Sequence, residues 1–198
     1  MVAKLVAYLA SLLLSSGLTT STTVAERTIP ISRQAGVASS VGVYAPQGAL
    51  GRLPTEAAPA VSCTDVEKKF VDLVNSERKR NGLPALSVNP LLVEVARDHS
   101  REMWEKNYFD HISPTPELRT PMHRYLKRLG HTPKWALLGE NLFYCSVVDV
   151  DRGHRCLMQS PKHRENILNP EYHEIGIGCI TTPDGRFYAT QLFLSQVD

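Results

Sequence analysis

The sequence predicts an α+β fold for the region from about residue 63 to residue 198, and three observations predict it. Segments with helical apolar spacing and recognisable caps fill the first two thirds of this region. The last third alternates between apolar and polar residues around a turn, which is typical of a β-hairpin. Strands and helices do not repeat in alternation, so a parallel α/β sheet is not indicated.

The first predicted helix begins after Thr64 and ends at Asn81-Gly82. Thr64 and Glu67 form a T-x-x-E capping box, in which each residue satisfies a backbone N–H of the other. Glycine after the last turn favours the left-handed C-terminal cap. The apolar residues recur at helical spacing, at Val66, Phe70, Leu73 and Val74.

Two further helices are predicted over 89–107 and 120–130, because each begins with a capping side chain followed by proline. His99 lies on the apolar face of the first of them, where we expect a core histidine hydrogen-bonded to a carbonyl group. A fourth helix is expected within 149–159, followed by a turn that begins at Ser160-Pro161.

The C-terminal hairpin is predicted from two alternating segments, 175–179 and 186–194, which flank a Pro-Asp-Gly turn at 183–185. The segment 131–145 has no clean helical period, and residues 140–145 within it are compatible with an extended strand. Helices followed by these few strands complete the α+β interpretation.

The N-terminus has the features of a secretory signal peptide over residues 1–25. Lys4 precedes a short apolar run, and small residues follow up to Ala25. The run is shorter than the roughly 20 residues that span a bilayer. An uncleaved anchor is the alternative, but export is the interpretation that we favour, with a secreted, extracellular or periplasmic location.

Residues 26–62 are predicted to be a flexible linker rich in Ala, Pro, Gly and Ser. They contain too few large apolar side chains to offset the entropy lost on ordering. The folded domain is then 63–198, a common size for one domain. It holds eighteen Lys and Arg against eighteen Asp and Glu, so its charge gives no basis for nucleic-acid binding. The basic group HRYLKR is interpreted as a solvated helix face.

The four cysteines, Cys63, Cys145, Cys156 and Cys179, predict two disulfides in an exported protein. We favour Cys145 with Cys156 and Cys63 with Cys179 among the three connectivities. Four free thiols are the alternative if the chain stays in a reducing compartment.

Several catalytic motifs are absent, including H-E-x-x-H and G-x-S-x-G. Imidazoles and carboxylates remain at His111, Glu140, His163, His173 and Glu174. Each of them has a structural explanation, such as a loop carboxylate that accepts backbone N–H groups. Spacing alone does not show that they meet.

Six sequence segments in order resemble the CAP superfamily (cysteine-rich secretory, antigen 5 and pathogenesis-related proteins, with an SCP domain) in its compact bacterial form. They are LVNSERKRNGLPALSVNPLL, ARDHSREMWEKNYFDHISP, GENL, SPKHRENILNP, EIGIG and YATQLF. The resemblance implies a three-layer α-β-α sandwich around a small antiparallel sheet of three or four strands. It also implies a cleft lined by two histidines and two acidic residues.

Matched by motif, the cleft residues are His111 of FDHISP, His163 of SPKHR and Glu140 of GEN. The second acid of animal and plant members falls where this chain reads RCLMQS, so we take Glu174 of EIGIG instead. His173 precedes Glu174 on an alternating strand and should point to the opposite face.

These four residues suit a divalent ion such as Zn²⁺. We therefore expect a secreted binding module with a metal-binding cleft and a protein, peptide or cell-envelope ligand. The alternative is a hydrolase of a peptide or cell-wall substrate, in which Glu140, His163 or a metal ion activates water. A third interpretation is a purely structural hydrogen-bond network.

Overall fold

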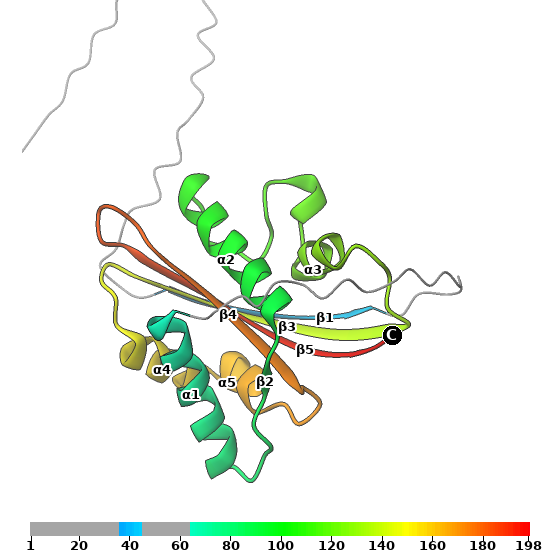
Figure 1. Cartoon of the computed structure of the whole chain (residues 1–198). Helices are drawn as coiled ribbons and strands as arrows, with labels where there is room; N and C mark the ends of the chain where they lie inside the picture. Colours follow the sequence, from blue (N-terminus) through cyan, green and yellow to red (C-terminus); the bar gives the residue numbers. More distant parts are fainter. Residues whose placement is uncertain (1–35, 45–63) are drawn as a thin grey trace, which may run out of the picture. The chain divides into compact units, whose positions relative to one another are not determined.

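Residues 36–44 and 64–198 are described in the computed structural model of the chain (Figure 1). The chain divides into two units, 1–32 and 33–198, and all described residues fall in the second. The predicted signal peptide, Cys63 and the rest of the predicted linker lie outside the described residues.

The predicted helices form where the caps indicate. The Thr64–Glu67 capping box is present, and Asn89 and Thr120 accept N–H bonds from the first turns that follow them. A helix replaces the turn expected at Ser160-Pro161, because proline at the first position is compatible with helical geometry. The helices are α1 (Asp65–Arg80), α2 (Pro90–Glu105), the 3₁₀ helix η1 (Pro116–Leu118), α3 (Pro121–Leu129), α4 (Val150–Gln159) and α5 (Pro161–Leu168). Within these described segments, no helix combines the length and apolarity needed to cross a bilayer.

The sheet has five strands in the order β1-β3-β5-β4-β2. Pairing is antiparallel except between β2 and β4, which are parallel. The expected sheet of three or four antiparallel strands is thus corrected to a mixed sheet of five. The strands are β1 (Gly36–Tyr44), β2 (Ser87–Val88), β3 (Trp135–Cys145), β4 (Glu174–Thr181) and β5 (Phe187–Val197).

Strand β1 comes from within the predicted linker, 26–62. It pairs with β3 along nine residues, from Gly36 opposite Tyr144 to Tyr44 opposite Ala136. Main-chain hydrogen bonds can hold an edge strand without large apolar side chains. The composition that predicted a linker therefore does not exclude a strand at this edge.

Helices cover both faces of the sheet, which confirms the three-layer sandwich (Figure 1). Side chains of α1, α4 and α5, such as Phe70, Leu157 and Ile167, form one core with Phe187 and Phe193 of β5. A second core joins α2 and α3 to the other face; its fully buried members include Leu92, Ala96, Leu138, Leu192 and Leu194. Because a glycine at 178 leaves room, α2 lies directly on β4: a Cβ there would be 2.0 Å from the Arg97 nitrogen.

The predicted Cys145–Cys156 disulfide is wrong, since both residues are free cysteines. Cys145 is buried at the end of β3, and Arg152 Nη1 donates to its Sγ at 3.7 Å. Cys145 belongs to the core as a small apolar group, and the partly buried Cys156 packs against that core. Cys63 is not among the described residues, so its pairing with Cys179 stays a prediction.

Candidate functional site

Glu140 is the centre of the candidate site. It occupies the middle of β3 in the apolar run LLGENLF, and its side chain is fully buried. Both carboxylate oxygens have partners: Oε1 accepts from His111 Nδ1 at 2.6 Å, and Oε2 accepts from Arg124 Nη2 at 2.6 Å. We call His111, Glu140 and Arg124 the His–Glu–Arg cluster.

Arg124 connects α3 to the loop that carries His111. Its side chain is only 3% exposed, and its Nη1 donates to the main-chain oxygens of His111 at 3.1 Å and Leu118 at 3.0 Å. One guanidinium group therefore fixes the loop and neutralises the carboxylate. A planar fork of donors suits this double role better than an ammonium group would.

The charge of Glu140 decides how His111 is protonated. Burial raises the pKa of the Glu140 carboxyl, but Arg124, His99 and His111 outweigh that effect and lower the pKa to about 2. The carboxylate is thus ionised at neutral pH and only accepts hydrogen bonds. His111 Nδ1 must donate, so in the neutral ring Nε2 is an acceptor. Within the described part of the chain, Nε2 is buried and has no hydrogen-bond partner.

A second polar network holds the loop on either side of His111. His99 is 1% exposed, and its Nε2 lies 3.2 Å from the Asp110 carbonyl oxygen, which confirms the expected core histidine. Glu102 accepts from Tyr108 Oη at 2.7 Å and from Ser113 Oγ at 2.9 Å. Burial raises the pKa of the Glu102 carboxyl, but hydrogen bonds from His99, Thr115 and Tyr108 outweigh burial and move the pKa far below its usual value.

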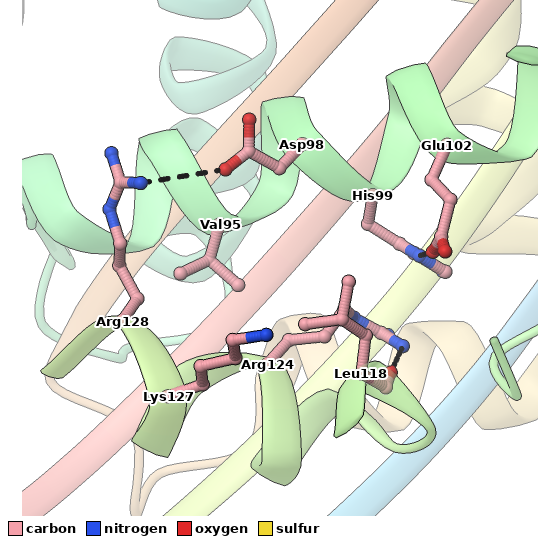
Figure 2. A pocket seen from close by; sticks show the side chains of 8 residues that line it. All are labelled: Val95, Asp98, His99, Glu102, Leu118, Arg124, Lys127 and Arg128. Carbon is pink, nitrogen blue, oxygen red and sulfur yellow. Dashed lines mark hydrogen bonds and ion pairs between the residues drawn. The ribbon is translucent and has the colours of Figure 1, made fainter. Parts of the chain in front are cut away.

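A pocket of about 330 Å³ opens between α2 and α3 beside this network (Figure 2). Acidic side chains come from α2 and basic side chains from α3, and Asp98 and Arg128 pair across it at 3.7 Å. Its volume is at the lower end of the range for small-molecule sites. The lining residues are Val95, Asp98, His99, Glu102, Leu118, Arg124, Lys127 and Arg128.

The other two predicted cleft residues are positioned by different elements. His163 is buried on α5, and its carbonyl oxygen accepts from Asn141 Nδ2 at 3.2 Å. Asn141 follows Glu140 on β3, so its side chain points to the opposite face of the sheet. Helix α5 therefore packs on the face away from the His–Glu–Arg cluster.

Glu174 begins β4, which is separated from β3 by β5. Its Oε2 accepts from Asn89 Nδ2 at 3.1 Å, which ties it to the cap of α2. His173, the residue before it, contacts Ser195 Oγ at 2.6 Å.

The donors in the His–Glu–Arg cluster do not fit a divalent ion as they are arranged. Both oxygens of Glu140 are engaged, and Arg124 places a positive charge 2.6 Å from one of them. In the described ranges, no three His, Cys, Asp or Glu side chains are grouped so as to hold a metal ion. Zn²⁺ binding by His111, Glu140, His163 and Glu174 stays a prediction.

Arg124 is the site residue that sequence reasoning missed. Its segment, HRYLKR, was interpreted as a solvated helix face, but Arg124 is among the buried residues of α3. The sequence signal that points to a buried cation lies in β3 rather than in α3. A glutamate inside an apolar strand needs a nearby cation, because an uncompensated buried carboxylate is strongly destabilising.

Comparisons with known proteins agree with this architecture. A model of the cysteine-rich secretory protein (CAP) family matches residues 71–193. The Bacillus subtilis (strain 168) protein YkwD is 39% identical over 126 residues, which are 64% of this chain and 46% of YkwD. The membrane protein YlbC of the same strain is 33% identical over 134 residues, 67% of this chain and 35% of YlbC. The chain thus spans less than half the length of either relative.

Two solved structures have the same fold. An extracellular SCP-domain protein from Bacillus anthracis (strain Ames) is 32% identical, with a TM-score of 0.52, over 65% of this chain and 39% of that chain. An outer surface protein from Borrelia burgdorferi is 21% identical, with a TM-score of 0.57, over 69% and 96% of the two chains. The family match covers more than half of the sequence and includes both layers of helices. The chain therefore belongs to the cysteine-rich secretory protein (CAP) family.

Proposed function

We propose that the protein is an extracellular binding module whose ligand contacts the His–Glu–Arg cluster. An extracellular location is supported by the predicted signal peptide over 1–25 and by the likeness to the extracellular Bacillus anthracis protein. The ligand that we propose is a protein, a peptide or a fragment of the cell envelope.

The observation that carries this proposal is the open acceptor on His111. Its Nδ1 is held by Glu140, while Nε2 is buried with no hydrogen-bond partner among the described residues. A buried acceptor left unpaired costs about 1–3 kcal/mol. A ligand that donates a hydrogen bond to Nε2 would recover that energy, so this atom favours binding.

The same geometry argues against Glu140 as a general base. A carboxylate whose pKa is about 2 is a weak base at neutral pH. Its oxygens are also occupied by His111 and Arg124. The role that fits Glu140 is to orient His111 and to hold its Nδ1 proton.

The test is binding of the full chain to an array of synthetic nonapeptides and to soluble peptidoglycan fragments. His111→Ala removes the open acceptor, and His123→Ala is the matched control, because His123 is an exposed residue of α3. We expect ligands that bind the wild type and His123→Ala equally and bind His111→Ala about tenfold more weakly. Equal binding by both variants, or no bound ligand, contradicts the proposal.

A hydrolase is the second candidate, and the 2.6 Å contact between His111 and Glu140 favours it. A carboxylate that holds Nδ1 leaves Nε2 able to take a proton from water, which is the arrangement of a histidine general base. Mass spectrometry of the peptides and fragments after incubation with the chain tests this candidate. Cleavage that Glu140→Gln abolishes supports a hydrolase; intact ligands throughout exclude it for these substrates.

A further inference from the structure

Strand β1 lies along the β3 edge between α3 and α5, beside the His–Glu–Arg cluster, and we call the position that it fills the groove. The floor of the groove is the edge of β3, with which β1 pairs over its whole length. One wall is α5, where Ser39 Oγ donates to the Lys162 carbonyl oxygen at 3.3 Å and accepts from Asn166 Nδ2 at 2.8 Å. The other wall is α3, because a Cβ at Gly42 would lie 3.8 Å from Met122 Cβ.

The side chains of β1 that are described contribute little apolar burial. Residues 39–42 read Ser-Ser-Val-Gly, and Val41 is 55% exposed. None of these four residues belongs to either hydrophobic core. Main-chain pairing with β3 and the Asn166 contacts therefore hold residues 39–42 in place.

The fit of β1 to the groove is incomplete at two positions. Ser40 lies directly opposite Glu140, so both side chains project to the face of the His–Glu–Arg cluster. The Ser40 hydroxyl is nevertheless buried with no hydrogen-bond partner in the described structure. At Gly42, an added Cβ would make only ordinary contact with Met122, which leaves room for a side chain.

We propose that the groove between α3 and α5, along the β3 edge, binds an extended peptide with small side chains in trans, and that residues 36–44 are its internal competitor. The inference rests on the proposed binding function and names the ligand class for the same site. An extended peptide that adds to a sheet edge gains affinity from main-chain bonds and specificity from alternate side chains. A ligand with a better residue than Ser40 or Gly42 at those two positions would displace β1.

Internal competition lowers the apparent affinity for a peptide in trans. A tethered segment acts at an effective concentration of roughly millimolar, so only weak net binding is expected while β1 is in place. Strand β1 also protects the β3 edge from pairing with other chains, since a long uncovered edge strand is a template for aggregation.

The experiment measures fluorescence anisotropy of a labelled peptide, GVASSVGVY, with the full chain and two double-proline variants. Ser39→Pro/Val41→Pro and Ser40→Pro/Gly42→Pro remove N–H groups that point to opposite sides of β1. One variant therefore loses donors to β3, and the other loses only outward-facing donors and is its matched control. Both should fold, because residues 39–42 are outside the cores.

We expect one double variant to bind the peptide about tenfold more tightly than the wild type and the control variant. Amide hydrogen exchange in β3 should be faster in that variant and slow again when the peptide is added. The inference is overturned by equal peptide binding in all three chains when hydrogen exchange shows that β1 has been released in one of them. Fast β3 exchange in the wild type also overturns it.

The two proposals fail separately. In one outcome, a ligand binds His111→Ala weakly but binds both proline variants as tightly as the wild type. The binding function then stands, and residues 36–44 are not a competitor of that ligand. In the other outcome, peptide binding is tighter in one proline variant but is unchanged by His111→Ala. The groove then remains the peptide site, and the proposed role of the His–Glu–Arg cluster in binding is contradicted.

Discussion

Replacing Glu140 by glutamine tests the electrostatics of the His–Glu–Arg cluster most sharply. Glutamine keeps the size of the side chain but removes the negative charge between His111 and Arg124, which lie 2.6 Å from its two oxygens. Arg124 is then a cation, 3% exposed, with no carboxylate partner at this position. We expect Glu140→Gln to fold with a lower free energy of unfolding.

Two estimates of the loss in the free energy of unfolding agree. The pKa of Glu140 falls from its usual 4.5 to about 2; at about 1.4 kcal/mol per pH unit, this is about 3 kcal/mol at pH 7. Removing one partner of a buried ion pair costs about 3–5 kcal/mol in other proteins. We therefore expect Glu140→Gln to lose about 3 kcal/mol at pH 7.

The sign of the pH dependence follows from the lowered pKa. The stabilisation by an ionised Glu140 is fully present above 4.5, the usual pKa, and is lost as the pH falls toward about 2. The difference between wild type and Glu140→Gln should therefore shrink as the pH is lowered from 7 toward 2.

Urea unfolding at several pH values measures this difference, with Glu117→Gln as the control because Glu117 is exposed on η1. The control should match the wild type within about 0.5 kcal/mol at every pH. A loss below about 1 kcal/mol for Glu140→Gln at pH 7, or a difference that does not shrink in acid, would show that the Glu140 carboxylate does not stabilise the fold as an ion-pair partner of Arg124.

Three further predictions concern other parts of the molecule. Thiol titration of the denatured, unreduced chain should find at least two free sulfhydryls, from Cys145 and Cys156; a count of zero would restore the disulfide. Gly178→Ala should lower the free energy of unfolding by about 3 kcal/mol, because its Cβ would meet α2. The comparison is Gly82→Ala, where an added Cβ meets open space but φ is 73°, so the free energy of unfolding should fall by only about 1 kcal/mol. Equal losses for the two variants would be inconsistent with tight packing of α2 on β4. In calorimetric titrations of the full chain with Zn²⁺, Arg124→Met should strengthen binding about tenfold by freeing Glu140, and His111→Ala should weaken it about tenfold by removing an imidazole ligand. Binding that neither variant changes would place the ion elsewhere.

Local signals predicted the helices well, because each cap is formed by residues close in sequence. The Thr64–Glu67 box and the Asn89 and Thr120 caps depend on side chains within three residues of the N–H groups they satisfy. The eight-residue helix after Ser160 was missed because Ser-Pro is common to turns and helix starts.

Features that depend on distant pairing could not be predicted from local patterns. Strand β1 exists because β3 offers an unpaired edge about a hundred residues later, and its own composition is typical of a linker. The contact between Arg124 and Glu140 joins α3 to β3, and nothing in HRYLKR distinguishes a buried arginine from an exposed one.

Only part of the site could be predicted, because its residues also come from segments that are distant in the sequence. The resemblance to the family places His111 and Glu140 in one cleft, and the two side chains are in direct contact in the structure. His163 and Glu174 have their printed contacts with Asn141 and Asn89, which belong to other parts of the sheet and its helices.

The most direct test of the account is nitrogen NMR of the full chain labelled with ¹⁵N-histidine. For the neutral His111 ring, we expect a proton on Nδ1, donated to Glu140, and an unprotonated Nε2. A ligand from the array should then shift the Nε2 resonance and leave Nδ1 protonated. A proton on Nε2 in the free protein, or a bound ligand that leaves both resonances of His111 unchanged, would contradict the account.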